Sequence, residues 1–164
     1  RALAETGATG LTHLGNGLPA KINRHENPIF AGLLEDSLMA MIITDGFHIP
    51  PSFIRLILKV KGAKNTIIVS DSAPAAGMPP GQYRYFGTDV QLKQSGRLVK
   101  SNTPYLAGSS CCIKECVDYM QSLKICTKRE LRRMAFDNPL AFLGLRPSDL
   151  EVHSTVGTDL DQGM

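Results

Sequence analysis

Residues 38–43 read Leu-Met-Ala-Met-Ile-Ile, and residues 66–70 read Thr-Ile-Ile-Val-Ser. Continuous apolar or β-branched runs of this kind are typical of strands buried on both faces of a sheet. Between them, Pro50 and Pro51 open a stretch with apolar residues at helical spacing, and Gly62 stands where that helix should end. This order of strand, helix and strand predicts a parallel α/β unit.

The segments on either side extend this pattern. Residues 11–14 form a short strand candidate between two glycines, and residues 29–35 look like a short helix. Residues 82–98 alternate apolar with polar side chains, which favours a β-hairpin or small meander inserted after the third parallel strand. Helices are expected again near Ser109.

Helix-capping signals mark the C-terminal third. Thr127 with Glu130 matches a capping box. A short helix is predicted from its N-cap, first-turn proline and C′ glycine, at Asn138, Pro139 and Gly144. From Arg146 onward the pattern weakens, and residues 157–164 look like a frayed end or a cut.

Composition limits the classes of function. The chain has 164 residues, room for one domain, and is 43% hydrophobic and 20% charged, which is typical of a globular protein. The longest apolar run, residues 38–43, is far shorter than the ~20 residues of a membrane-spanning helix. The net charge of +3 is too small to indicate nucleic-acid binding, and the basic residues of 124–133 fit a solvated helix face better. No secretory leader opens the sequence.

The four cysteines indicate a reducing compartment. Three of them, Cys111, Cys112 and Cys116, lie within six residues, and Cys126 follows. We expect reduced thiols in a cytoplasmic protein. Cys112 and Cys116 are spaced for one helix face and could hold a metal, but no second pair with zinc-finger spacing follows, so buried helix residues are the better interpretation.

Polar side chains follow each predicted parallel strand. His13 follows the first, Asp45 and His48 the second, and Asp71 the third. Because parallel strands in a barrel end on one face, we expect His13, His48 and Asp71 to converge there. Each also has a structural alternative: a loop histidine, or for Asp71 a helix cap. For Asp45, a turn residue is the interpretation we favour.

The loop after the first strand has features of an anion site. Asn16 lies between Gly15 and Gly17, and the missing side chains would let an anion reach the backbone N–H groups. Lys21 and Arg24 are near in sequence and could supply positive charge. Asn16 could equally be an ordinary left-handed turn residue.

Five motifs in order carry a resemblance to a known family. They are THLGNGL at 12–18, Arg24, TDGFH at 44–48, SDSAPAAG at 70–77 and LAGS at 106–109. Their order and spacing resemble those of the N-acetylglucosamine-6-phosphate deacetylases, members of the amidohydrolase superfamily of metal-dependent barrel hydrolases. The resemblance covers roughly residues 8 to 145.

The resemblance implies a fold and a chain organisation. Residues 1–145 would form strands six to eight, with helices, of a TIM-type (β/α)8 barrel, and the β-hairpin insert would span about 82–100. Residues 146–164 would be a tail or the truncated start of a small β-domain. A full barrel needs ~250 residues, so we expect the C-terminal part of a longer enzyme.

The resemblance also implies roles for individual residues. His13 matches the family's metal-binding histidine; the metal would be a divalent ion, zinc with iron, cobalt or nickel as alternatives. Asp71 matches the catalytic aspartate, and His48 the histidine that binds substrate and acts in catalysis. The substrate-binding positions are Asn16, Gly17 and Arg24 for the phosphate, and Leu106 and Gly108 in the loop that lines the sugar site.

The chain departs from the family pattern at several positions. Gly15 stands where the family usually has tyrosine, Gly17 and Leu18 stand where it has alanine and methionine, and His25 separates Arg24 from its usual glutamate neighbour. A glutamate and a histidine that complete the family's metal site have no counterpart. These differences bear on substrate preference and on completeness of the site.

The implied function is removal of the acetyl group from N-acetylglucosamine 6-phosphate, giving glucosamine 6-phosphate and acetate in amino-sugar metabolism. The implied enzyme is a cytoplasmic homodimer that binds neither nucleic acid nor membrane. Two alternatives remain open. One is another amidase of the amidohydrolase superfamily, such as a dihydroorotase-like enzyme; the other is a catalytically incomplete fragment that only binds sugar phosphate.

Overall fold

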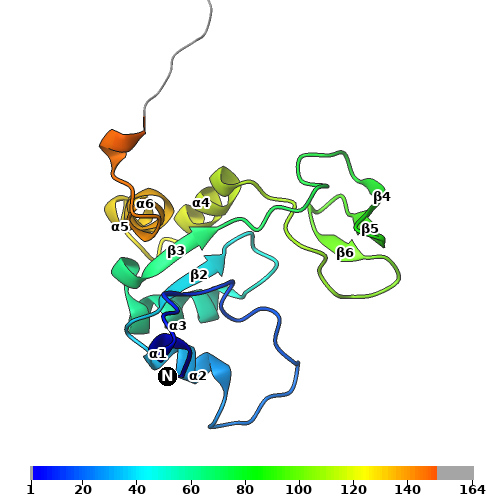
Figure 1. Ribbon diagram of the computed structural model, residues 1–164. Helices are drawn as coiled ribbons and strands as arrows, with labels where there is room; N and C mark the ends of the chain where they lie inside the picture. Colours follow the sequence, from blue (N-terminus) through cyan, green and yellow to red (C-terminus); the bar gives the residue numbers. More distant parts are fainter. Residues whose placement is uncertain (1, 151–164) are drawn as a thin grey trace, which may run out of the picture.

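A computed structural model describes residues 2–150, which form a mixed α/β structure with two small sheets (Figure 1). The first sheet is parallel, in the order β1 (Gly10–Leu11), β2 (Met39–Ile43) and β3 (Thr66–Val69). Ala40 of β2 pairs with Leu11 on one side and with Thr66 on the other. The prediction of three adjacent parallel strands is confirmed.

Strand β1 is shorter than the predicted residues 11–14. The chain turns after Leu11, and His13 adopts a positive φ of 35°, which interrupts extended backbone. The chain nevertheless stays against β2, because the Leu14 N–H donates to the Met41 carbonyl at 2.8 Å. His13 therefore lies in a tight turn held against the sheet.

The helices around this sheet begin and end close to the predicted positions. The predicted helix at 29–35 is α2 (Pro28–Leu34), where the Asn27 side chain accepts from the Phe30 N–H at 3.0 Å. Helix α3 (Pro51–Lys61) ends at Gly62, which has the positive φ expected of a terminating glycine. The short elements are α1 (Ala2–Glu5), η1 (Ala63–Asn65) and η3 (Pro147–Asp149).

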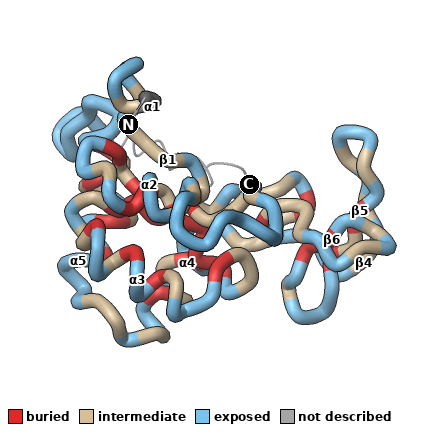
Figure 2. The backbone as a smooth tube through the Cα atoms, turned by 90° about the horizontal axis from the view of Figure 1, so that it is seen from below, coloured by how far each residue is buried: buried red, intermediate tan, exposed pale blue. Residues whose placement is uncertain are grey.

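One main core holds the parallel sheet and its helices together. Ala40, Ile42 and Ile68 of the strands contribute to it, with Ile54 and Ile57 of α3. Figure 2 shows buried residues gathered in this body of the molecule. Strands buried on both faces need apolar residues throughout, which explains the continuous apolar runs.

The predicted insert is confirmed as an antiparallel meander of β4 (Gly81–Tyr85), β5 (Thr88–Leu92) and β6 (Leu98–Lys100). A two-residue turn, Phe86–Gly87, joins β4 to β5, and both residues have positive φ. The meander extends from the rest of the molecule (Figure 1) and has a small core of its own.

The C-terminal helices differ from the prediction in two places. Helix α4 (Ile113–Ser122) begins four residues after Ser109, which is buried beside β3. The predicted N-cap role of Asn138 is wrong, because helix continues from α5 (Lys128–Arg132) through a π-helical turn, η2 (Arg133–Asp137), into α6 (Asn138–Phe142). The Asn138 amide instead donates to the carbonyls of Ala63 and Thr66.

Pro139 accounts for the π-helical turn. Proline lacks the N–H of a helical hydrogen bond, and its ring clashes with the carbonyl four residues earlier. A π-turn widens the helix at that point and relieves the clash. The capping box of Thr127 and Glu130 and the positive φ of Gly144 are as predicted.

The four cysteines are free thiols, as expected. Cys116 is buried, but Cys112 is exposed at the start of α4, so the expectation of a buried residue there is wrong. Within residues 2–150, no helix is long and apolar enough to cross a membrane. The described strands form two small sheets and no closed barrel. The predicted frayed end at 157–164 lies outside the described residues.

Candidate active site

The carboxyl ends of the three parallel strands carry the predicted site residues. His13 follows β1, His48 follows β2 and Asp71 follows β3. The local backbone positions each of these residues, and each has a different set of neighbours. Among residues 2–150 no hydrogen bond joins the three directly, so their convergence around one ligand stays a prediction.

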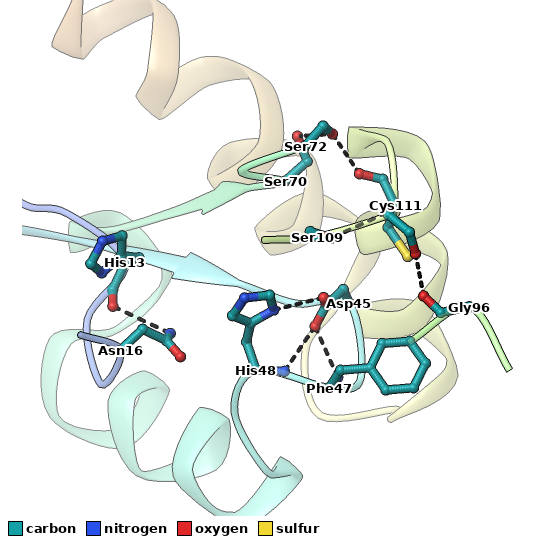
Figure 3. Close-up of polar contacts among 11 residues, drawn as sticks. His13, Asn16, Asp45, Phe47, His48, Ser70, Ser72, Gly96, Ser109 and Cys111 are labelled. Carbon is teal, nitrogen blue, oxygen red and sulfur yellow. Dashed lines mark hydrogen bonds and ion pairs between the residues drawn. The ribbon is translucent and has the colours of Figure 1, made fainter. Parts of the chain in front are cut away.

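Asp45 and His48 form the most tightly built pair at this edge. The His48 Nδ1 lies 2.7 Å from the Asp45 Oδ2, and the two side chains are 7% and 1% exposed, respectively. Asp45 Oδ1 accepts from the backbone N–H groups of Phe47 and His48 at 2.9 and 3.0 Å. Figure 3 shows the His48 ring turned toward the carboxylate. The turn role expected of Asp45 is correct, and it also orients the histidine.

Burial by itself would raise the pKa of Asp45. The hydrogen bonds from His48 and from the two backbone N–H groups lower the pKa, and their effect is larger than that of burial. The pKa of Asp45 is therefore lowered from its ordinary value. An ionised carboxylate inside the turn is consistent with the short contact to His48.

His13 occupies a different environment. Its Nδ1 is buried and has no hydrogen-bond partner among the described residues. The Asn16 N–H and side-chain amide both turn back to the His13 carbonyl, at 2.9 and 3.3 Å (Figure 3). The loop from His13 to Asn16 is thus closed on itself, which fixes the backbone of the histidine.

Asp71 is held by its backbone rather than by its side chain. It has a positive φ of 49°, uncommon for a residue other than glycine. Its carbonyl accepts from the Ser109 N–H at 3.2 Å, and the Ala73 N–H donates to the Ser109 carbonyl at 2.8 Å. The chain then continues to β4 without a helix, so the alternative of a helix cap is wrong.

The loop at 106–109 lies between Asp71 and the antiparallel meander. Leu106 forms an isolated β-bridge with Val99 of β6, and Gly108 has a positive φ. A Cβ on Gly108 would lie 3.0 Å from the Ala73 Cβ, so only glycine fits without a shift. The loop therefore contacts the meander at Leu106 and the segment after β3 at Gly108 and Ser109.

The departure from the family pattern at Gly15 has a steric cause in this chain. A Cβ at Gly15 would lie 2.3 Å from Cε1 of the Phe53 ring, which comes from α3. Gly17 lies next to the imidazole, since a Cβ there would lie 3.4 Å from His13 Cε1. Phe53 therefore fills the space that a side chain at position 15 would need.

The predicted phosphate-binding residues occupy an exposed loop. Arg24 is exposed and forms no ion pair with any described residue, and Lys21 is likewise exposed. The loop is shaped by Asn23, whose side chain accepts from the His25 and Glu26 N–H groups at 2.9 Å each. Both cations are therefore free to meet an anion.

Curated proteins similar to this chain are described as N-acetylglucosamine-6-phosphate or N-acetylgalactosamine-6-phosphate deacetylases. It is 32% identical over 145 residues to an N-acetylgalactosamine-6-phosphate deacetylase of Escherichia coli O157:H7, covering 88% of this chain and 38% of that protein. It is 30% identical over 133 residues to an E. coli K12 protein named as a candidate N-acetylgalactosamine-6-phosphate deacetylase, covering 81% of this chain and 78% of that protein. The chain belongs to the N-acetylglucosamine-6-phosphate deacetylase family.

Solved structures of this deacetylase family have the same fold. A point mutant of the Mycobacterium smegmatis enzyme, in complex with N-acetyl-D-glucosamine-6-phosphate, superposes with a TM-score of 0.80 at 26% identity, covering 88% of this chain and 39% of that one. The Thermotoga maritima deacetylase gives 0.78 at 29% identity, covering 87% and 39%. No protein-family model matches the chain.

The chain spans 38% and 39% of the length of the first two curated deacetylases it matches, those of E. coli O157:H7 and Bacillus subtilis. Among residues 2–150, no three His, Cys, Asp or Glu side chains group as a metal site. The buried Nδ1 of His13, lacking a partner, fits a single metal ligand. The described residues thus fit one donor of a metal site rather than a full set.

One contact at this edge was not predicted from the sequence. Asp45 was expected only to shape a turn, whereas it also holds the His48 ring. The available signal was the spacing Asp-Gly-Phe-His, because an aspartate that caps a turn has its second oxygen free for a side chain three residues later.

Proposed function

We propose that this chain is the part of an N-acetylglucosamine-6-phosphate deacetylase that carries strands six to eight of its amidohydrolase barrel. The observation that carries the proposal is the edge of the parallel sheet, where three adjacent strands are followed by His13, by Asp45 with His48, and by Asp71. Family membership supports the same reaction: hydrolysis of the acetamide to glucosamine 6-phosphate and acetate, in a cytoplasmic homodimer.

Substrate binding begins with the phosphate. Arg24 would meet it bidentately, because the planar guanidinium matches two phosphate oxygens. The Asn16 side chain and the Gly17 backbone would complete the contact, and Leu106 and Gly108 would line the sugar. Binding energy from the phosphate positions the acetamide, which is remote from it.

Asp71 is the proposed general base. Its carboxylate is exposed at the end of β3, and its carbonyl is held by the Ser109 N–H. It would take the proton of the attacking water and return it to the amine that leaves. The small residues that follow, Ser72 to Gly77, leave room for a sugar.

His48 is the proposed partner of the acetyl carbonyl. Its Nδ1 is occupied by Asp45, so Nε2 is the nitrogen available to substrate. A donor fixed before the substrate arrives stabilises negative charge on the carbonyl oxygen without reorganisation.

His13 would contribute one ligand to a divalent metal, zinc or alternatively iron, cobalt or nickel. Such an ion supplies an activated water at neutral pH by lowering the pKa of that water. The remaining ligands would come from outside residues 2–150. In this chain, His13 would contribute its imidazole ring, and its backbone is held by the turn to Asn16.

One observation favours a second candidate function. Since the described residues offer only one fitting metal donor, the 164-residue chain by itself could bind sugar phosphate without hydrolysing it. This activity would need only the Arg24 loop and the strand ends.

One experiment separates the two. Acetate release and calorimetric binding are both measured with zinc and N-acetylglucosamine 6-phosphate, for the 164-residue chain and for a longer enzyme that includes the remaining metal ligands. Acetate release that needs the phosphate supports the deacetylase. Binding by the 164-residue chain together with no release by the longer enzyme supports the second candidate, and absence of both contradicts the two proposals together. N-acetylgalactosamine 6-phosphate, the substrate type named for the E. coli relatives, serves as the comparison.

A further inference from the structure

The contact between Asp45 and His48 restricts where the imidazole proton can be. Asp45 Oδ2 lies 2.7 Å from Nδ1, and Oδ1 already accepts two backbone N–H groups. A carboxylate only accepts hydrogen bonds, so a bond of this length requires a proton on Nδ1. The lowered pKa of Asp45 is consistent with that ionised state.

Whether the other ring nitrogen, Nε2, donates or accepts a hydrogen bond then depends on the charge of the ring. In a neutral imidazole with Nδ1 protonated, Nε2 is an acceptor; it donates only in the imidazolium. Figure 3 shows Nε2 pointing away from Asp45, on the side where His13 lies. No described residue forms a hydrogen bond with it. A carbonyl oxygen, which accepts only, can therefore meet Nε2 only when the ring is charged.

We propose that Asp45 is a positioning residue that keeps the His48 proton on Nδ1, so that His48 donates to the acetyl carbonyl as an imidazolium paired with Asp45. The assignment of the carbonyl as the partner rests on the proposed deacetylase function. The assignment of the proton to Nδ1 rests on the contact with Asp45 Oδ2 and on the ionised state of that carboxylate.

The surroundings keep this pair rigid and free of competing charge. Gly46 has a positive φ of 83°, and a Cβ there would lie 3.0 Å from the Tyr119 ring of α4, so the turn fits closely against that helix. Besides His48, the titratable groups that interact with Asp45 are the thiols of Cys111 and Cys116. Burial raises the pKa of both, that of Cys116 to about 12, so both are uncharged near neutral pH.

The substitution Asp45→Asn should reverse the arrangement. The amide oxygen can still accept the Phe47 and His48 N–H groups, which leaves the NH₂ facing Nδ1. An NH₂ group donates, so Nδ1 would become the acceptor and the proton of the neutral ring would move to Nε2. The shape of the side chain is kept.

The test is nitrogen NMR of histidine-labelled full chain, with the His48 signals assigned by their loss in His48→Gln. In the wild type, we expect Nδ1 to be protonated throughout the pH range, whether the ring is neutral or doubly protonated. A neutral wild-type ring protonated on Nε2 would overturn the proposal. This measurement needs no variant at position 45, so a folding defect cannot obscure it.

The variant supplies the second readout. In Asp45→Asn the neutral His48 ring should carry its proton on Nε2, while the exposed His25 keeps the wild-type spectrum as an internal control. An unchanged His48 tautomer would contradict the role of Asp45. In the active enzyme kcat should fall about 10-fold or more with little change in KM, since a charged donor becomes a neutral one. An equal kcat would contradict the imidazolium.

The two proposals can fail separately. A wild-type spectrum with Nδ1 protonated, together with no deacetylase activity, would refute the proposed function and support the positioning role of Asp45. Deacetylase activity with the proton on Nε2 would do the reverse.

Discussion

Asp71 stands in a backbone conformation that costs free energy. A non-glycine residue with φ of 49° lies in the left-handed region, and such positions persist only where the surroundings enforce them. Here the two hydrogen bonds to Ser109, from its N–H to the Asp71 carbonyl and from the Ala73 N–H to its carbonyl, hold the backbone that follows Asp71. Strained residues gather at functional sites, which agrees with the proposed catalytic role.

Replacing Asp71 by asparagine keeps the shape and removes the base. We expect kcat for acetate release to fall by ~10²-fold or more, with substrate affinity little changed, because the phosphate contacts lie elsewhere. Steady-state kinetics together with separate calorimetric binding provide the measurement. Asp118→Asn, on the exposed face of α4, is the matched control. Wild-type kcat in Asp71→Asn would refute the general-base assignment.

Arg24 should act on affinity rather than on the chemical step. Arg24→Ala removes a charged hydrogen-bonding pair with phosphate, so KM for N-acetylglucosamine 6-phosphate should rise about 10-fold or more. The unphosphorylated sugar should show no such difference. Arg55→Ala, another exposed arginine on α3, controls for loss of charge. An Arg24→Ala enzyme with the wild-type KM would place the phosphate elsewhere.

At the scale of elements, a buried lysine ties α3 to the connection between α2 and β2. Lys61 is 4% exposed, and its ammonium donates to the carbonyls of Glu35 and Leu38, the latter at 2.8 Å. Burial lowers the pKa of Lys61, partly opposed by the carboxylates of Asp36 and Glu35. The lysine acts as a cross-link between helix and loop.

Lys61→Met should destabilise the chain by about 1–3 kcal/mol, because it removes the ammonium that donates to the buried Leu38 carbonyl. The measurement is the free energy of unfolding in urea. Lys64→Met, at an exposed position in η1, should have little effect. Equal stability of the two variants would show that the Lys61 contacts contribute nothing.

Two glycines with nearly the same backbone test the contact between the His13 loop and α3. Gly15 and Gly7 have φ of 94° and 92°, but only Gly15 has a neighbour, the Phe53 ring. Both alanine variants carry the backbone penalty, and Gly15→Ala should lose about 1–3 kcal/mol more from overpacking. Adding Phe53→Leu should recover part of this loss. Equal unfolding free energies for Gly7→Ala and Gly15→Ala would disprove the close approach.

The elements that the sequence predicted well are those determined by local pattern. The apolar runs at 38–43 and 66–70 became β2 and β3, and Gly62 ended α3, because burial and backbone freedom leave few alternatives. The turn at His13 and the role of Asn138 were not predictable. The first depends on pairing with β2, and the second on carbonyls 72 and 75 residues away in sequence.

The same division applies to the site. The residue types after each strand were visible in the sequence, since ligating and catalytic side chains follow the carboxyl ends of parallel strands. The contact of Asp45 with His48 depends on side-chain orientation, and its spacing in the sequence was the one signal for it. The hydrogen bond from Ser109 to the Asp71 carbonyl could not be predicted, because it joins chain segments 38 residues apart. The shared role of His13, His48 and Asp71 is still a prediction.

For the molecule as a whole, acid should weaken the fold through Asp45. The folded-state pKa of Asp45 lies below its ordinary value of 3.8, so its ionised form contributes stability above that value, and the contribution is lost as the pH falls through the folded pKa. Unfolding free energies measured from about pH 6 downward should decline more in the wild type than in Asp45→Asn. Parallel declines would mean that Asp45 titrates alike in both states.

The central claim is that sugar phosphate binds at the carboxyl edge of the parallel sheet, and mapping the bound ligand on the chain tests it most directly. Backbone amide NMR of the full chain is recorded while N-acetylglucosamine 6-phosphate is added. We expect shifts at Gly17, His48 and Ser72, with the turn at Phe86 and Gly87 unaffected. Shifts confined to the opposite edge or to the meander tip, or the same shifts with N-acetylglucosamine lacking phosphate, would contradict it.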